Sequence, residues 1–140
     1  MNLPIQDLEA LFRQAVVAEA KATRTDPDHV ATQWALTYAD AALAVFERYR
    51  PSNRKPRALL RAARAWLATQ SPKALQEFNR ARSTFFNRPG SGKYKAPVYA
   101  SRAIIEAVAA VNHSFPLDCV LQAALHLRKA EAYARHHEHA

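Results

Sequence analysis

The stretch that decides the fold is RPSNRKPRALLRAARAWLATQSPKALQEFNRARSTFF, residues 50–86. Each half holds a proline followed by an apolar stripe of helical period: Leu59, Ala63 and Trp66 after Pro56, then Ala74, Phe78, Ala81 and Phe85 after Pro72. Proline suits the first helical turn, because the N–H group that it lacks would have no partner there. The stretch therefore predicts two consecutive helices, over 56–69 and 72–87.

The same punctuation divides the rest of the chain. Six prolines stand just before an apolar pattern of helical period: Pro4, Pro27, Pro56, Pro72, Pro97 and Pro116. Pro51 and Pro89 instead follow such patterns and end them, while Asp26 and Ser71 offer N-cap side chains. The expected helices cover 4–23, 27–49, 56–69, 72–87, 97–113 and 116–136. No strand pattern occurs.

Composition favours one helical domain over residues 1–140. Thirty alanines favour helix and allow close helix approach, and the two glycines both lie in one loop. We expect an all-α fold, a compact bundle of about six helices arranged mostly as antiparallel hairpins. The expected apolar faces of the first two helices are Ile5, Leu8, Phe12 and Ala15, and then Val30, Trp34, Tyr38, Ala41 and Val45.

Several functional classes are disfavoured by the sequence. The acidic start MNLPIQDLEA does not suit a secretory signal, no stretch is apolar enough to span a membrane, and the lone Cys119 is expected to be a buried thiol. These features predict a cytoplasmic location without membrane association. No hydrolase or nucleotide-binding motif is present, so we expect neither an enzyme nor a cofactor. The His-rich tail, residues 136–140, is expected to fray, and its histidines predict only adventitious metal affinity.

Charge is concentrated in the middle of the chain. Residues 48–102 hold fourteen of the twenty Lys and Arg side chains and a single acid, Glu77. Both flanks are mildly acidic. Such a polarised field steers an anionic partner toward one surface.

The basic side chains recur at helical spacing. Arg57, Arg61 and Arg64 share one face of the helix at 56–69, opposite Leu59 and Ala63. The candidate partner-binding residues are Arg54, Lys55, Arg57, Arg61, Arg64, Arg80, Arg88, Lys93, Tyr94 and Lys95. The alternative is a solvated helix face, partly paired with Asp40 and Glu47 of the preceding helix. For the segment 88–95, the alternatives are a cationic partner-binding loop and a plain helix connector.

Three tyrosines lie close to this charge in the sequence. Tyr49, Tyr94 and Tyr99 would provide stacking surfaces for bases if they were exposed, or would complete the edge of the core if they were not.

Three stretches of the chain are residues 50–85, YASRAIIEAVAA and AALHLRKAEAYA. Together they resemble a family of small Ala-rich immunity proteins of bacterial polymorphic-toxin systems. The matching positions are Lys55, Pro56, Arg57, Ala58, Arg61, Ala62, Arg64, Ala65, Trp66, Ala132, Tyr133 and Ala134. The resemblance spans roughly residues 31–134 and implies an all-helical inhibitor. Where that family has histidines in its last helices, this chain has Cys119, Val120 and Gln122.

Two functional classes follow from these patterns. The first is a non-catalytic inhibitor or immunity-type protein whose basic surface binds an acidic protein target such as a toxin. We expect a monomer by default, with a homo-oligomer formed through an Ala-rich face as the alternative. The second is a nucleic-acid-binding module that contacts phosphates through Arg57, Arg61, Arg64, Arg80, Lys93 and Lys95. Neither a recognition helix nor an RNA-binding signature accompanies the charge.

Overall fold

The computed structural model describes residues 5–86, 94–112 and 116–136. Helices in these ranges are α1 (Ile5–Thr23), α2 (Pro27–Tyr49), α3 (Lys55–Thr69), α4 (Pro72–Phe86), α5 (Lys95–Asn112) and α6 (Pro116–His136). Their bounds lie within two residues of the expected ones, and the described residues contain no strand. The all-α prediction is confirmed.

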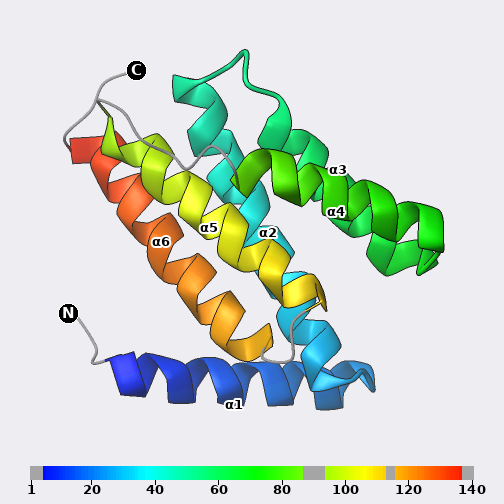
Figure 1. Cartoon of the computed structure of the whole chain (residues 1–140). Coiled ribbons are helices and arrows are strands. Elements are labelled where there is room, and N and C mark those ends of the chain that lie inside the picture. The colour runs from blue at the N-terminus through cyan, green and yellow to red at the C-terminus, as the bar shows by residue number, and fades with distance from the viewer. Residues whose placement is uncertain (1–4, 87–93, 113–115, 137–140) are drawn as a thin grey trace.

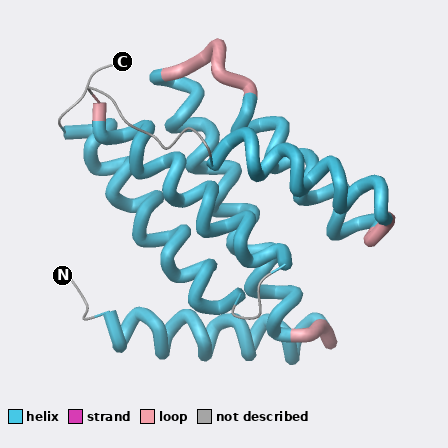
Figure 2. The backbone as a smooth tube through the Cα atoms, viewed as in Figure 1, coloured by secondary structure: helices cyan, strands magenta, loops and turns pink. Residues whose placement is uncertain are grey.

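Three long helices form the centre of the molecule. The hairpin of α5 and α6 packs along α2, which contacts both helices although it is distant from them in sequence (Figure 1). Helices α3 and α4 form a second antiparallel hairpin beside the central helices (Figures 1 and 2). Helix α1 crosses the lower end of the central helices in this view (Figure 1). The expected hairpins are thus found at α3–α4 and α5–α6, whereas α2 packs mainly against helices that do not follow it directly.

Alanine dominates the interfaces of the three central helices. The fully buried alanines of these helices are Ala35, Ala39 and Ala42 of α2, Ala96, Ala100, Ala103 and Ala107 of α5, and Ala123 and Ala130 of α6. Leu36, Ile104, Val108 and Val120 fill the space between them and are also almost completely buried. Small side chains bring the helix backbones close together, so the core depends on close fit more than on large apolar groups.

Two details of the expected apolar faces were wrong. Ala15 and Ala41 are exposed, whereas Val16, Ala20 and Ala39 are buried. Because α5 and α6 together cover a broad arc of α2, the buried face of that helix is turned away from Ala41. Helix α1 meets its neighbours mainly through Val16, Ala20 and partly buried aromatic contacts, so its buried stripe is correspondingly narrow.

Aromatic edge contacts fix α1 across the end of the central helices. The Phe12 ring lies edge-on to Trp34 and Tyr38, with ring centroids 6.5 and 6.3 Å apart. Leu11, the residue before Phe12, points away from this contact and is 51% exposed. No helix in the described part of the chain is long and apolar enough to cross a membrane.

The ends of the helices follow the sequence signals in part. The Ser71 Oγ accepts a hydrogen bond from the Ala74 N–H at 3.1 Å, as expected for an N-cap of α4. Asp26 occupies the N-cap of α2, but its side chain makes no capping hydrogen bond, contrary to expectation. Arg24 and Gln70 follow α1 and α3 with φ angles of 54° and 53°, a left-handed conformation that glycine more commonly supplies.

Candidate partner-binding surface

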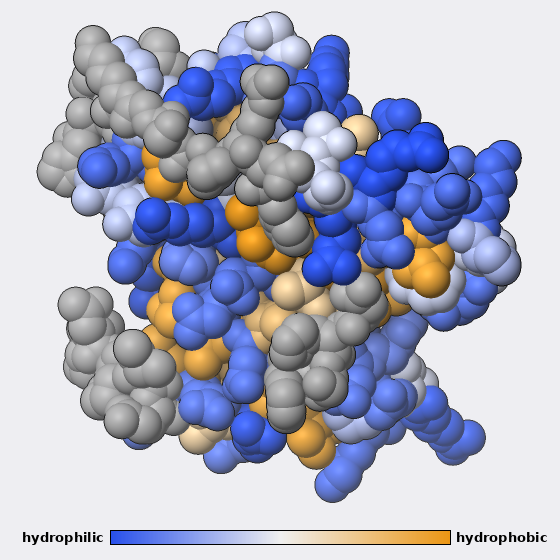
Figure 3. Space-filling model, in the orientation of Figure 1, coloured by the Kyte–Doolittle hydropathy of each residue, from blue (hydrophilic) through white to orange (hydrophobic). Residues whose placement is uncertain are grey.

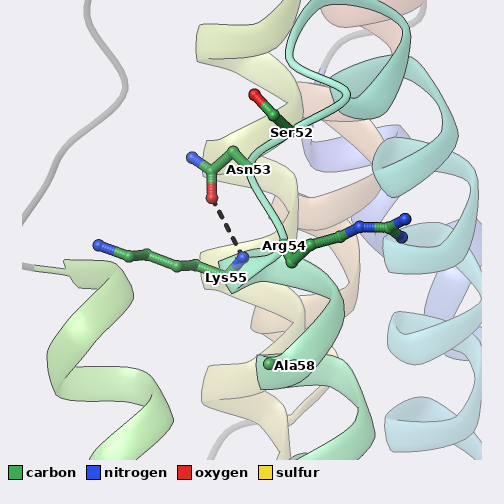
Figure 4. A pocket seen from close by; sticks show the side chains of 5 residues that line it. All are labelled: Ser52, Asn53, Arg54, Lys55 and Ala58. Atoms are coloured by element: carbon green, nitrogen blue, oxygen red, sulfur yellow. Dashed lines mark hydrogen bonds between the residues drawn. The ribbon is translucent and has the colours of Figure 1, made fainter.

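The first turn of α3 is the centre of the basic segment. The Asn53 Oδ1 accepts a hydrogen bond from the Lys55 N–H at 3.1 Å, which satisfies one free donor at the start of the helix. From this point the Lys55 side chain extends toward α4 and the Arg54 side chain extends in the opposite direction, toward α2 (Figure 4). In this view Ser52 and Asn53 lie above the first turn of α3, and Ala58 lies on the helix below Lys55 and Arg54 (Figure 4).

This arrangement is unfavourable for the helix itself. The N-terminus of a helix carries a partial positive charge, so acidic side chains stabilise the first turn and basic side chains oppose it. The first turn of α3 contains no acid and begins at Lys55, immediately after Arg54. A partner that supplies negative charge would remove this repulsion.

Three shallow depressions meet around the exposed side chain of Ala58. Their volumes are about 510, 260 and 240 Å³. Their lining residues are Ser52, Asn53, Arg54, Lys55 and Ala58 for the first, Arg54, Arg57, Ala58 and Arg61 for the second, and Lys55, Ala58, Glu77, Arg80, Ala81 and Thr84 for the third. We call the group Arg54, Lys55, Ala58, Arg61 and Arg80 the α3 surface. It has a small apolar centre and a rim of four cations, with Glu77 beside Arg80.

The predicted arginine stripe is not uniformly cationic. Arg57 makes a bidentate ion pair with Glu47 of α2. Its Nε donates a hydrogen bond to Oε2 at 2.9 Å, and its Nη2 donates one to Oε1. The hydrogen bond from Arg57 lowers the pKa of Glu47, and the charges of Arg57 and Arg54 lower it further. Arg57 is therefore occupied by a carboxylate of its own chain.

Arg64 is paired in the same way. Its two terminal nitrogens donate to the two carboxylate oxygens of Asp40 at 2.9 and 2.7 Å. Arg61, between the two paired arginines, is exposed and makes no ion pair with a described residue. The alternative in which Asp40 and Glu47 partly neutralise the stripe is confirmed for these two pairs.

Helix α4 supplies the other side of the α3 surface. Arg80 is exposed and lies with Glu77 along the depression that also includes Lys55. The darkest blue atoms of the space-filling view gather over the upper part of the molecule and over the α3–α4 hairpin (Figure 3). The structure thus brings Arg54, Lys55, Arg61 and Arg80 together around one hairpin.

The cationic loop expected over 88–95 is described only at its end. Arg88 and Lys93 lie outside the described residues. Tyr94 is 37% exposed and its ring lies 5.4 Å from that of Tyr49, while Lys95 is exposed and begins α5. The end of the loop therefore carries an aromatic pair beside a lysine.

A second cluster, which the sequence analysis missed, lies between α5 and α6. The Tyr99 ring is stacked against the rings of Tyr133 and His126, and the cationic groups of Arg102 and Lys129 lie over it. The signal was present in the spacing, since residues 126, 129 and 133 share one face of a helix.

The remaining candidates of the sequence carry no site in the described residues. Cys119 is buried, and burial, followed by the charges of Glu106 and Asp118, raises the pKa of its thiol to about 11. Within 5–86, 94–112 and 116–136, no group of three His, Cys, Asp or Glu side chains could hold a metal ion. Most of the His-rich tail, residues 137–140, lies outside these ranges.

Comparison of the chain with protein-family models, with curated proteins and with solved structures finds no match. The class that the fold and the surface define is an all-α bundle with a cationic hairpin.

Proposed function

We propose that the protein is a non-catalytic binding protein whose α3 surface docks an acidic segment of a partner protein. The observation that carries this proposal is the meeting of three depressions at Ala58, with Arg54, Lys55, Arg61 and Arg80 around them. None of these four cations makes an ion pair with a described residue. Carboxylates on a partner would find unpaired guanidinium and ammonium groups around an apolar contact point.

The mixed charge of this region favours a protein over a nucleic acid. Asp40 and Glu47 neutralise Arg57 and Arg64, which leaves a short cationic patch instead of a continuous stripe that could follow a run of phosphates. The half-buried Ala62 and Ala65 extend the apolar strip of α3 beyond Ala58. Protein interfaces combine such apolar centres with a polar rim, and arginine is enriched in them.

The inhibitor class is part of this proposal. The residues shared with immunity proteins of polymorphic-toxin systems include Lys55, Arg57, Ala58 and Arg61, of which three belong to the α3 surface. On this basis the acidic partner is a toxin, and binding of the α3 surface blocks it by occlusion. A protein that acts in this way needs no cofactor.

One observation favours a second candidate function, nucleic-acid binding. The ring pair of Tyr49 and Tyr94 lies at the start of α5, the Arg48 guanidinium lies 5.7 Å from the Tyr49 ring centroid, and Lys95 follows directly. Aromatic rings beside cations are typical of single-strand binding surfaces, because bases stack on the rings while cations contact phosphates.

Fluorescence anisotropy separates the two functions. The probes are a labelled peptide with glutamates around a leucine, the same peptide with every Glu replaced by Gln, single-stranded RNA and duplex DNA, each at two salt concentrations. We expect the Glu peptide to bind more tightly than the Gln peptide, and the nucleic acids to associate only weakly. Submicromolar, saturable binding of RNA or DNA at physiological salt would instead establish the second candidate.

Variants then locate the binding. The double substitution Arg54→Glu with Arg61→Glu should abolish binding of the Glu peptide. The control, Lys21→Glu with Arg135→Glu, changes net charge equally at exposed positions on α1 and α6 and should bind as the wild type does. Equal losses in both variants would show a general charge effect and would refute the assignment to α3. Arg57 and Arg64 are avoided, because substituting either would break its ion pair with Glu47 or Asp40.

A further inference from the structure

The cluster between α5 and α6 is built on the ring of Tyr99. The Tyr133 ring lies nearly parallel to it, at 6° and with ring centroids 5.6 Å apart, and the His126 ring lies at 25° and 6.1 Å. Tyr99, His126 and Tyr133 are each partly buried, so the three rings form a semi-exposed stack that joins the two helices. We call these residues, together with Arg102 and Lys129, the Tyr99 cluster.

Two exposed cations share the central ring. The Arg102 Cζ lies 5.1 Å from the Tyr99 ring centroid and the Lys129 Nζ lies 5.3 Å from it. Neither makes an ion pair with a described residue. The two like charges repel each other, and the attraction of each cation to the ring offsets part of this repulsion. Each such contact contributes only about 0.5–1 kcal/mol at an exposed site.

His126 adds a third basic group. Its Nδ1 is buried without a hydrogen-bond partner. An orphaned acceptor is tolerated better than an orphaned donor, so we assign Nδ1 as the unprotonated nitrogen, which leaves Nε2–H as the donor of the ring. Burial lowers the pKa of His126, and the charges of Arg102 and Lys129 lower it further, which agrees with a neutral ring near two cations.

No described acid of α5 or α6 makes an ion pair with Arg102 or Lys129. Glu106 lies one turn beyond Arg102 on α5, and its charge raises the pKa of the Cys119 thiol. Glu131 of α6 lies at a hollow on the other side of the helix, which is lined by residues of α1 and α2 as well. The Tyr99 cluster therefore combines a neutral imidazole and two cations that pair with no described acid, all around one aromatic stack.

We propose that the Tyr99 cluster binds a phosphate group. A phosphate dianion placed between Arg102 and Lys129 would cancel their repulsion, and guanidinium, ammonium and imidazole N–H groups are the donors that phosphate oxygens accept. The same group could come from inorganic phosphate or from a nucleotide, whose base could also stack on the aromatic rings. This site is separate from the α3 surface and does not depend on the function proposed for it.

Proton NMR titration with sodium phosphate tests the site, with sodium chloride at matched ionic strength as the reference. We expect saturable shifts of the His126 and Tyr99 ring signals with phosphate and none with chloride. Arg102→Gln and Lys129→Gln should each weaken binding at least tenfold, because each removes a charge-assisted contact. Both residues are exposed, so the variants should keep the helical circular dichroism of the wild type.

Matched controls make the result specific. Arg128→Gln removes an exposed charge next to Lys129 in sequence but outside the cluster, and should leave phosphate binding unchanged. Arg54→Glu with Arg61→Glu should also leave it unchanged. Shifts no larger than those with chloride, or equal weakening by Arg128→Gln, would overturn the proposal. Adenosine monophosphate distinguishes the sources: tighter binding than inorganic phosphate points to a nucleotide, and equal binding points to free phosphate.

Discussion

Enlarging one buried alanine tests the packing of the central helices. Ala39 is 0% exposed and lies on α2, which packs against both α5 and α6. Substitution Ala39→Leu adds three carbon atoms where no space exists, so the helices must move apart or the leucine must adopt a strained rotamer. Overpacking of this kind costs about 1–3 kcal/mol. For a chain of this size, that corresponds to a fall in Tm of about 3–12 °C.

The control for this experiment lies on the same helix. Ala41 is exposed, so Ala41→Leu changes the same residue type with little effect on packing and should alter the free energy of unfolding by no more than about 0.5 kcal/mol. Urea unfolding monitored by circular dichroism measures both variants, and their midpoints are compared at equal slopes. Equal stability of the two leucine variants would refute close alanine packing at α2.

Further predictions concern a core ring, a surface ion pair and two titrating groups. Phe78→Ala should cost about 3–5 kcal/mol of unfolding free energy, since Phe78 is fully buried. In a double-mutant cycle, the exposed pair of Arg64 and Asp40 should contribute less than about 1 kcal/mol. Folding lowers the pKa of His126, so just below pH 6.5 the unfolded chain binds more protons than the folded one. The free energy of unfolding should therefore fall as the pH drops through this window. His126→Gln should remove this contribution to the pH dependence of stability, as measured by denaturation at several pH values. Cys119, with a thiol pKa of about 11, should react with a thiol reagent at pH 8 far more slowly in the native than in the unfolded protein.

Local sequence signals predicted the helices well because their causes are local. The first-turn prolines Pro27, Pro56, Pro72 and Pro116 all lie within two residues of the start of their helices. The packing of α2 against α5 and α6 could not be derived in the same way. It depends on which alanine faces fit closely across large separations in the chain, and alanines at every position look alike in a sequence.

The candidate site was predicted in outline, and its internal pairing only as an alternative. Clustering of Arg54, Lys55, Arg61 and Arg80 follows from the α3–α4 hairpin that the prolines predict. The ion pair of Arg64 with Asp40 requires α2 beside α3, a tertiary relation that helical spacing cannot give. For the Tyr99 cluster, spacing shows that His126, Lys129 and Tyr133 share one face of α6, but not that this face meets Tyr99 and Arg102 of α5.

NMR mapping of the bound peptide tests the central claim most directly. The ¹⁵N-labelled protein is titrated with the peptide of glutamates around a leucine, and the amide shifts are placed on the structure. Docking at the α3 surface predicts the largest amide shifts at Ala58, Arg61 and Lys55. The Gln-substituted peptide should cause little change in these amide signals. Shifts confined to other helices, or equal shifts with both peptides, would contradict docking of an acidic segment at this surface.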